Sequence, residues 1–337
     1  MKAMILAAGL GTRLRPLTYT MPKPMVPVLN RPLIGWAIEA FLGLGVDEIV
    51  INLHHLPGSL ESYVTGTYGD RMRFHFSFEE EILGTSGGIR RVRDHLENPD
   101  GFYLVNGDTV QLPPYEKLRE ARDRTGALAA LTLRHPPAND RFTAVWLDDG
   151  RVTGFGQGRG EPLMFSGSHL ISNHVFAQIP DKEFSGIVDE VYIPQLVNGA
   201  GIIAGIVDDG PWFDVGNPKR LIDASRSLLA LANAGGFTPP LGSDLLHGSL
   251  IHQTAIVSSS VESSTAGADS RIDGHVRDSA IWERCVIPAS TTVECSIVAH
   301  DVTLPAGATF TSVLVCNDDP SIPKDLPREN GLVVTKI

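Results

Sequence analysis

Strand and helix signals alternate through the first part of this 337-residue chain, and this alternation restricts its fold more than any other feature. Apolar runs typical of strands occur at 3–6, 48–53, 74–78 and 102–105. Helical spacing of apolar residues separates them at 33–44, 85–97 and 115–124. The alternation predicts an α/β domain with a doubly wound, largely parallel sheet. Ligands bind such sheets at the carboxyl ends of the strands, where Gly9 and Asp108 are expected.

The periodicity changes after a turn-rich segment at 234–248, which we interpret as a linker. Beyond it, single aliphatic residues recur every four to seven positions, and the unit that begins at Ser279 recurs from Ser296. This spacing is close to a coil of three short strands, and such coils stack as a parallel β-helix. The pattern resembles left-handed β-helices built from hexapeptide repeats, well over 250–315 and less well before Ile272. A small irregular β domain is the alternative.

The expected organisation is therefore an α/β domain at 1–233, the linker at 234–248, β-helix repeats at 249–318 and a C-terminal tail at 319–337. Lys and Arg number 28 against 39 Asp and Glu, a net charge of −11 that disfavours general nucleic-acid binding. No run approaches the roughly 20 apolar residues of a membrane span, so no membrane association is expected. Three cysteines without metal-ligand spacing favour a reducing compartment and a cytoplasmic location.

The most informative motif follows the first strand and reads Leu6-Ala7-Ala8-Gly9-Leu10-Gly11-Thr12-Arg13, with Pro22-Lys23-Pro24 shortly after it. Glycines at this place let backbone N–H groups approach a phosphate or a base, and the two prolines restrict the direction of the lysine. The motif lacks the Gly-Lys-Ser/Thr of a Walker loop and the third glycine of a dinucleotide fold. Two glycines alone also fit an ordinary tight turn, so the phosphate-binding interpretation depends on the cations.

Two aspartates follow apolar strands, Asp108 in Asn106-Gly107-Asp108 and Asp214 in Trp212-Phe213-Asp214-Val215-Gly216. Magnesium prefers one or two carboxylates together with phosphate oxygens and water. Taken alone, Asp108 also fits a turn residue, and Asp214 fits the N-cap of the following helix. Together with Arg13 and Lys23, the two aspartates fit a single phosphate chemistry.

Over residues 1–232 these motifs closely resemble the signature of the sugar-1-phosphate nucleotidylyltransferases, and the β-helix resembles that of longer members such as mannose-1-phosphate guanylyltransferases. The resemblance implies that Arg13, Lys23, Asp108 and Asp214 are catalytic. It also implies that Asp108 and Asp214 hold Mg²⁺. It implies nucleotide contacts from Leu6, Ala7, Ala8, Gly9, Gly11, Thr12 and Arg13.

A further segment, Glu79-Glu80-Glu81 followed by Leu83-Gly84-Thr85-Ser86-Gly87-Gly88, resembles the family's loop for the base and ribose. Three consecutive acids usually form a solvated turn. We expect one of them, taken here as Glu81, to accept an N–H of the base. Thr85 and Gly88 complete the predicted nucleotide-binding set.

The turn Phe165-Ser166-Gly167-Ser168 resembles the family's sugar-binding turn, and the predicted sugar contacts are Asn106, Gly107, Gly167 and Glu190. A surface helix end is the alternative for Glu190. Many relatives carry an upstream Glu-Lys-Pro whose lysine holds the sugar phosphate. This chain has Arg159 between glycines instead, either as a substitute or as a solvated side chain. N-acetylmuramate 1-phosphate uridylyltransferases resemble it in lacking that segment.

The sequence thus predicts an enzyme that joins a sugar 1-phosphate to an NTP, giving an NDP-sugar and pyrophosphate. The expected pairs are mannose 1-phosphate with GTP, or an amino-sugar 1-phosphate such as that of N-acetylmuramate with UTP. One alternative is a non-catalytic, NDP-sugar-binding regulatory subunit, which would be expected to lose one of the four catalytic residues. Another is an additional acyltransferase in the β-helix, although His252, His275 and His300 are expected at the surface. The β-helix is expected to form a homo-oligomer interface.

Overall fold

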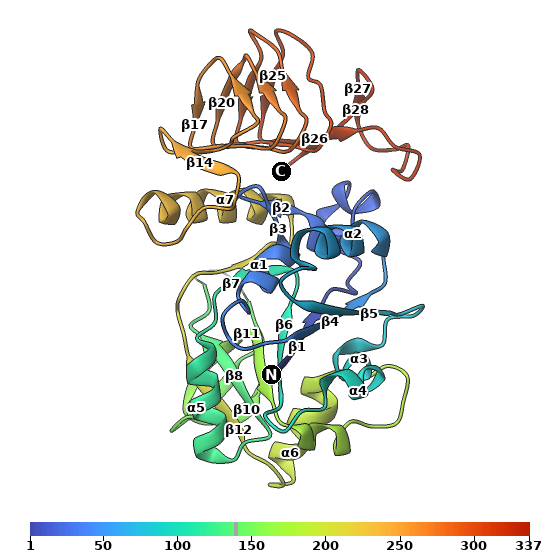
Figure 1. The fold of residues 1–337 in the computed structure, drawn as a ribbon, viewed down its shortest axis with the longest axis vertical. Coiled ribbons are helices and arrows are strands. Elements are labelled where there is room, and N and C mark those ends of the chain that lie inside the picture. The colour runs from blue at the N-terminus through green and yellow to red at the C-terminus, as the bar shows by residue number, and fades with distance from the viewer. Residues whose placement is uncertain (138–140) are drawn as a thin grey trace. The chain divides into compact units, whose positions relative to one another are not determined.

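The computed structural model describes residues 1–137 and 141–337 (Figure 1). Their contacts divide them into two compact units. We call Met1–Gly9 with Ile34–Trp212 the sheet unit, and Leu10–Leu33 with Phe213–Ile337 the coil unit. The chain therefore passes from one unit to the other inside the glycine motif, between Gly9 and Leu10.

The sheet unit is built on a nine-stranded sheet of order β5-β4-β1-β6-β11-β8-β12-β10-β9. Strands β5, β4, β1 and β6 are parallel neighbours, β11 runs antiparallel between β6 and β8, and β8 is parallel to β12. The strands of the unit are β1 (Lys2–Leu6), β4 (Glu48–Leu53), β5 (Arg73–Phe78), β6 (Phe102–Asn106), β7 (Thr109–Gln111), β8 (Ala129–Arg134), β9 (Val145–Asp148), β10 (Arg151–Phe155), β11 (Glu161–Ile171) and β12 (Ile203–Val207).

Helices pack on this sheet, with α5 against β8, β11 and β12, α4 against β1 and α2 against β5. Buried aliphatic side chains from strands and helices fill the core between these layers. The helices are α1 (Leu33–Glu39), α2 (Pro57–Tyr68), α3 (Gly84–Arg91), α4 (Arg93–Leu96), α5 (Tyr115–Thr125) and α6 (Ile193–Val197), with a 3-10 turn η4 (Asn173–Ala177) and a π-helical turn η5 (Val188–Tyr192).

The predicted α/β class is confirmed, and the strand expected at 48–53 is β4 itself. Two helices are shorter than their apolar periodicity suggested. The helix expected over 33–44 ends at Glu39, after which the chain continues in tight turns that contain Gly43 and Gly45, both with positive φ. The helix expected over 85–97 is broken at Val92 into α3 and α4.

The coil unit contains a loop of short elements, one long helix and a stack of coils, drawn from orange to red in Figure 1. The loop holds η1 (Thr12–Leu14), η2 (Leu17–Tyr19), η3 (Lys23–Met25), β2 (Pro27–Val28) and β3 (Arg31–Pro32). Helix α7 (Pro218–Asn233) follows β13 (Trp212–Asp214), within which the chain enters this unit for the second time. Buried apolar residues of α7, Leu221, Leu228 and Leu229 among them, lie along one face.

The coils form three parallel sheets, which confirms a parallel β-helix and excludes the irregular β domain. Its left-handed sense stays a prediction. The first sheet holds β14 (Ser243–Leu246), β15 (Ser249–His252), β18 (Thr265–Ala266), β21 (Ala280–Ile281), β24 (Ile297–Val298), β26 (Val313–Asn317), β28 (Leu332–Lys336) and β27 (Arg328–Glu329). The other two hold β16 (Ile256–Val257), β19 (Arg271–Ile272) and β22 (Val286–Ile287), and β17 (Val261–Glu262), β20 (His275–Arg277), β23 (Thr292–Glu294) and β25 (Thr309–Thr311).

Strand register explains why the repeat weakens before Ile272. Leu250 pairs with Thr265 and Thr265 with Ala280, so the early coils advance by a step of 15 in the numbering. Ala280 pairs with Ile297, a step of 17, which is the spacing seen in the sequence. The additional length of the later coil falls between β22 and β23.

A buried ladder of serines joins successive coils. The hydroxyl oxygens of Ser249, Ser264 and Ser279 accept the backbone N–H of the serine one coil further on, at 3.2, 3.0 and 3.0 Å, the last of these being Ser296. The hydroxyl of Ser296 in turn accepts the N–H of Val313 at 3.1 Å. The serine hydroxyl of each coil thereby provides an acceptor for a backbone N–H of the next coil, which would otherwise lack a hydrogen-bond partner inside the stack.

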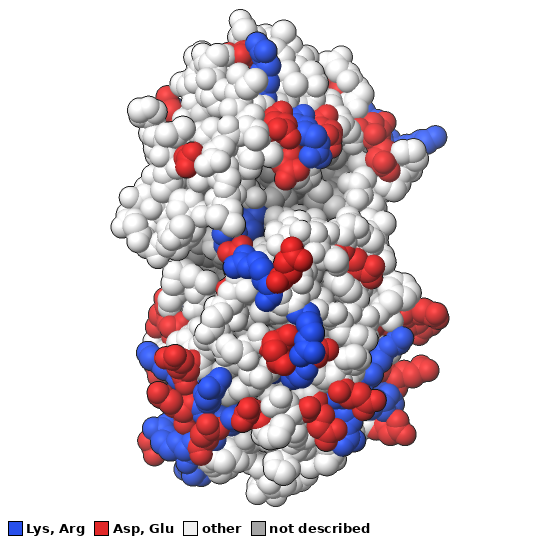
Figure 2. Space-filling model, viewed as in Figure 1, with Lys and Arg blue, Asp and Glu red and all other residues white. Residues whose placement is uncertain are grey.

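Segments expected to be a linker and a tail both contribute strands to the coil unit. β14 pairs antiparallel with β15 at one end of the first sheet. At the other end β28 pairs antiparallel with β26, and the two-residue β27 pairs antiparallel with β28. The predicted domain limits at 233, 248 and 318 stay a prediction, because the compact units are assembled from discontinuous segments. Among the described residues, no helix is long and apolar enough to cross a bilayer. Acidic and basic side chains are interspersed on the face drawn in Figure 2.

Ser279→Ala is expected to lower the free energy of unfolding of the coil unit by about 1–3 kcal/mol, because it leaves the buried N–H of Ser296 without an acceptor. Urea unfolding followed by circular dichroism measures the loss. Thr311→Ala, on an outward and exposed position of β25, is the matched control and should change stability by less than about 0.5 kcal/mol. Equal effects of the two substitutions would contradict a structural role for the serine ladder.

Candidate active site

The carboxyl ends of three parallel strands in the sheet unit are joined by a chain of buried hydrogen bonds. Ala7, just after β1, donates its backbone N–H to Asn52 Oδ1 at 2.8 Å. Asn52 Nδ2, at the end of β4, donates to Glu79 Oε1 at 2.8 Å. The second carboxylate oxygen of Glu79, which follows β5, accepts the N–H of Leu83 at 3.0 Å. This chain fixes the loops that follow β1, β4 and β5 relative to one another.

Of the three consecutive acids, Glu79 is fully buried and both of its oxygens have partners, whereas Glu81 is exposed. Glu79 is therefore a structural residue that the sequence interpretation did not separate from its neighbours. Gly88 is buried in α3, where a Cβ would lie 3.0 Å from Glu79 Oε1, so a larger residue would press on this carboxylate. Nucleotide contacts from Glu81, Thr85 and Gly88 stay a prediction.

The glycine motif has different requirements at its two glycines. Ala7 and Ala8 are buried after β1, and a Cβ at Gly9 would meet nothing within 4 Å, so the backbone of Gly9 is open to a ligand. Gly11, in the coil unit, has φ of +61°, and a Cβ there would lie 2.8 Å from Lys23 Cβ. Gly11 is thus required both by its backbone conformation and by the close approach of Lys23.

Lys23 is 5% exposed and lies in η3, where Pro22 and Pro24 flank it. Arg13 is exposed, and its guanidinium nitrogens lie 3.0 Å from the position that a Cβ of Gly216 would occupy. The coil unit therefore brings Arg13 next to the segment that contains Asp214. A side chain at residue 216 would displace the arginine from this place.

Asp214 is half-buried at the end of β13 and forms an ion pair with Arg220 of α7. The N-cap of α7 is Asn217, whose Oδ1 accepts the N–H of Arg220 at 2.9 Å. The alternative of Asp214 as a helix cap is therefore excluded. Its carboxylate is held by Arg220 instead, in a segment that approaches Arg13.

Asp108 is half-buried in the short connection between β6 and β7 of the sheet unit. Gly107 donates its N–H to the carbonyl oxygen of Leu6 at 2.9 Å, and a Cβ at Gly107 would lie 2.9 Å from both that oxygen and Ile5 Cγ2. Close packing against β1 accounts for the glycine. The predicted sugar contact of Gly107 stays a prediction.

The predicted sugar turn is a bulge of β11 against β8, located between Phe165 and His169. Gly167 has φ of +95°, and a Cβ there would lie 2.5 Å from Asn106 Nδ2, so the Asn106 side chain lies directly over this glycine. His169 is buried, contacts the Tyr192 hydroxyl at 2.8 Å, and has its pKa lowered by burial to about 3. It is therefore neutral at physiological pH, and it lies at the end of the bulge that forms the turn.

Two of the remaining sequence candidates lie at the surface. Glu190, in η5, forms an ion pair with Lys182, and a sugar contact would have to compete with this pair. Arg159 has an 83% exposed side chain and pairs with Asp148 at 3.2 Å. Its solvated surroundings favour the surface interpretation over a role as a phosphate anchor.

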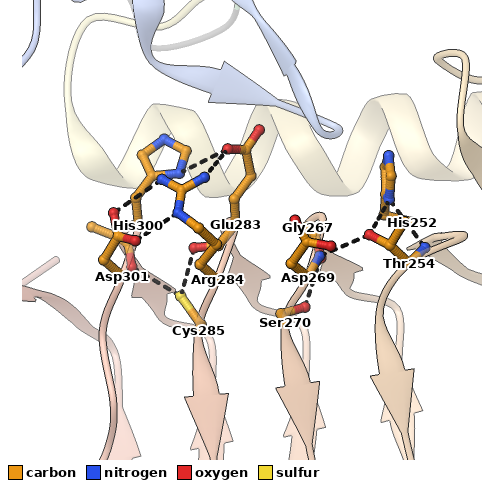
Figure 3. A network of polar contacts seen from close by, with 11 residues as sticks. His252, Thr254, Gly267, Asp269, Ser270, Glu283, Arg284, Cys285, His300 and Asp301 are labelled. Carbon is orange, nitrogen blue, oxygen red and sulfur yellow. Dashed lines mark hydrogen bonds and ion pairs between the residues drawn. The ribbon is translucent and has the colours of Figure 1, made fainter.

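Two histidines of the β-helix, His252 and His300, belong to polar networks between coils (Figure 3), whereas His275 is exposed as expected. His252 contacts Thr254 at 2.9 Å, as expected for a surface residue. His300 is not at the surface as predicted: its side chain is only 22% exposed, it packs on Trp282, and burial lowers its pKa. Arg284 beside it is held by Asp301 and Glu283. These contacts connect adjacent coils. This structural role explains why the residues are present, so an additional acyltransferase activity is not needed to explain them.

The predicted catalytic residues thus form two groups. Asp108 lies in the sheet unit beside the sugar turn, and Arg13, Lys23 and Asp214 lie in the coil unit. Sequence reasoning missed Asn52 and Glu79, whose signal was a polar residue within or just after an apolar strand at the ligand edge of the sheet. It also missed Arg134 and Trp212, which flank the sugar turn; Trp212 donates its Nε1–H to the carbonyl oxygen of Ser166 at 2.9 Å.

With this geometry in place, comparison with known proteins gives the class. A profile described as nucleotidyl transferase matches residues 2–230. The chain belongs to this family, and it is a nucleotidyltransferase enzyme. Solved structures include HddC from Yersinia pseudotuberculosis in complex with GMP-PN, which has a TM-score of 0.57 at 23% identity and covers 67% of this chain and 99% of that one. This similarity supports the fold of the sheet region.

Curated relatives extend the similarity into the β-helix. The chain is 25% identical to mannose-1-phosphate guanylyltransferase 1 of Arabidopsis thaliana, over 99% of this chain and 96% of that protein. It is 30% identical to the probable mannose-1-phosphate guanylyltransferase 2 of the same organism, over 76% and 72% of the two chains. A UTP–glucose-1-phosphate uridylyltransferase of Synechocystis is 28% identical over 68% and 64%.

Glu79→Leu is expected to destabilise the sheet unit by about 2–4 kcal/mol, because it leaves the buried donors of Asn52 and Leu83 without acceptors. Glu79→Gln should cost less, since its carbonyl oxygen still accepts one of them. The change is measured by urea unfolding. Glu80→Gln, at an exposed neighbouring position, is the control and should leave the transition where it is. A transition of Glu79→Leu that matches the control would contradict the structural role of Glu79.

Proposed function

We propose that the chain transfers a nucleotidyl group from an NTP to a sugar 1-phosphate and releases pyrophosphate. The observation that carries the proposal is that two basic side chains, Lys23 and Arg13, are held in place around the glycine motif. Lys23 is buried against Gly11, and Arg13 lies against Gly216. Family membership and the activities for which the curated relatives are named support the same reaction.

The preferred substrates are mannose 1-phosphate and GTP. The relatives that align over 99% of this chain, β-helix included, are mannose-1-phosphate guanylyltransferases. An amino-sugar 1-phosphate with UTP is the second candidate, supported by the absence of the Glu-Lys-Pro segment and by the uridylyltransferase among the relatives. Three free cysteines are consistent with a cytoplasmic location.

The reaction requires no covalent enzyme intermediate. A phosphate oxygen of the sugar 1-phosphate attacks the α-phosphorus of the NTP in line, the bond to the β-phosphate oxygen breaks, and pyrophosphate leaves. The enzyme contributes positioning and neutralisation of charge. In this proposal Arg13 and Lys23 stabilise the negative charge that accumulates on the triphosphate and on the departing pyrophosphate.

Asp108 and Asp214 are the residues that would hold Mg²⁺. Both are half-buried carboxylates, the hard oxygen donors that this ion prefers. Among the described residues, no three His, Cys, Asp or Glu side chains are grouped as a metal site. Mg²⁺ takes few protein ligands and completes its shell with phosphate oxygens and water. When bound, such an ion neutralises phosphate charge. Arg220, which pairs with Asp214, orients this carboxylate.

A non-catalytic regulatory subunit is the competing proposal. Arg13, Lys23, Asp108 and Asp214 are all present in this chain, which favours the enzyme. Self-association through the β-helix remains part of the proposal. Because the first sheet ends in the short strands β14 and β27, which offer little edge for pairing, we expect the sides of the coils to form the interface rather than that sheet's ends.

Lys23→Ala is expected to raise the barrier by about 2–4 kcal/mol, a roughly 30- to 900-fold loss of kcat/KM, because it removes one preorganised charge from the phosphate loop. Pyrophosphate release with Mg²⁺ is measured for GTP and UTP, each crossed with mannose, glucose and N-acetylmuramate 1-phosphates. Lys117→Ala, an exposed lysine of α5, is the control and should keep wild-type activity. Full activity of both Lys23→Ala and Asp108→Asn would contradict the assignment, and a wild-type protein inactive with every pair would favour the regulatory subunit.

A further inference from the structure

One arginine of the sheet unit has an unsatisfied donor near the sugar turn. Arg134 is the last residue of β8, and its Nη1 donates to the carbonyl oxygen of Gly210 at 3.0 Å. Its guanidinium carbon lies 5.3 Å from the centre of the Trp212 ring. The Nε atom is buried and has no hydrogen-bond partner among the described residues. A buried N–H without a partner is costly, and a ligand that supplies an acceptor removes this cost.

The contacts of Arg134 lead directly to the sugar turn. Trp212, on which the guanidinium lies, donates to the carbonyl oxygen of Ser166 at 2.9 Å. The next residue, Gly167, is covered by the side chain of Asn106, which precedes Asp108 by two positions. β8 runs parallel to β12 and, through β11, in the same direction as β6. Arg134 therefore lies at the same edge of the sheet as Asp108.

Two carboxylates near the end of β8 make their hydrogen bonds to His135 rather than to this arginine. Asp209 accepts the backbone N–H of His135 at 2.9 Å and contacts its Nδ1 at 2.7 Å, while Glu161 contacts His135 Nε2 at 2.9 Å. Hydrogen bonds to Asp209 and Glu161 raise the pKa of His135, so its ring carries a positive charge over a wider pH range than a free histidine. Both acids are thus hydrogen-bonded to His135 and neither forms an ion pair with Arg134, although the charge of Arg134 contributes to lowering the pKa of Asp209.

We propose that Arg134 binds the phosphate of the sugar 1-phosphate. The inference rests on the proposed function and identifies the anchor that the sequence leaves open. With Nη1 bound to Gly210, the edge formed by Nε and Nη2 remains, and two parallel N–H groups match two phosphate oxygens. Stacking on Trp212 fixes the plane of this edge. Arg159, the cation suggested by position in the sequence, is exposed and paired with Asp148.

The test compares Arg134→Gln and Arg134→Lys with wild type, using mannose 1-phosphate with GTP and glucose 1-phosphate with UTP. A contact made in the ground state and kept in the transition state raises KM rather than lowering kcat. Arg134→Gln should raise the KM for the sugar 1-phosphate roughly 10- to 100-fold, the usual range for a hydrogen bond to a charged group, and change the KM for the NTP less than about twofold. Arg134→Lys keeps the positive charge but lacks the two parallel N–H groups. Its KM for the sugar 1-phosphate should therefore lie between those of wild type and Arg134→Gln. Arg159→Gln is the matched control and should behave as wild type.

Two further measurements separate binding from folding and from turnover. Guanidinium chloride at millimolar concentration should partly restore the sugar 1-phosphate KM of Arg134→Ala, a rescue that a packing defect would not show. Calorimetric titration with mannose 1-phosphate alone should show weaker binding to Arg134→Gln than to Arg159→Gln. The proposal is overturned if folded Arg134→Gln keeps the wild-type KM and affinity for sugar 1-phosphate, or if both KM values rise equally. A wild-type protein that binds mannose 1-phosphate through Arg134 but transfers no nucleotide would overturn the proposed function alone.

Discussion

The arrangement of the ligand edge depends on one buried carboxylate. Glu79 accepts hydrogen bonds from the Asn52 side chain and from the Leu83 backbone, and Asn52 in turn holds the N–H of Ala7. Three loops that come from distant parts of the sequence are thereby fixed at one edge of the sheet. The glycines around it follow from the same constraint, because Gly88 leaves room for the carboxylate and Gly107 packs on the end of β1. A phosphate-binding surface made of backbone needs such support, since glycines provide no side chains to hold it.

The β-helix supports the loop that contains the predicted catalytic cations. The loop with Arg13 and Lys23 belongs to the same compact unit as the coils. Asn30 Nδ2 donates to the carbonyl oxygen of Ala266 at 3.0 Å, and Ser321 Oγ donates to that of Tyr19 at 3.4 Å, so both ends of the coil stack contact the loop. The stack itself is held by its aliphatic core and by the serine ladder. Its regularity gives Arg13 and Lys23, the cations predicted to bind phosphate, a rigid support.

The sequence predicted the fold well where a periodic pattern reported local structure. Alternating strands and helices gave the α/β class, and the repeat around Ala280 and Ile297 gave the β-helix. The sequence did not predict features that depend on tertiary contacts. Nothing in three consecutive glutamates shows that Glu79 is buried and Glu81 exposed, because the difference depends on Asn52, 27 positions away. The early coils were unclear because they are shorter than the later unit from which the repeat was read. Arg134 was overlooked because an arginine at a strand end has no motif, and only its contacts with Trp212 and Gly210 distinguish it from a surface arginine.

Taken together, the fold, the family and the fixed cations describe an enzyme that moves a nucleotidyl group, with attack at the α-phosphorus. The most direct test follows the phosphorus atoms of GTP in the presence of mannose 1-phosphate and Mg²⁺. With GTP labelled in the α-phosphate, the account predicts that the label enters the sugar nucleotide. With GTP labelled in the γ-phosphate, it predicts that the label leaves as pyrophosphate. An α-label that stays in GTP would contradict the assignment of GTP. Transfer of the γ-label to the sugar product, or an α-label that enters no sugar nucleotide with either GTP or UTP, would contradict nucleotidyl transfer.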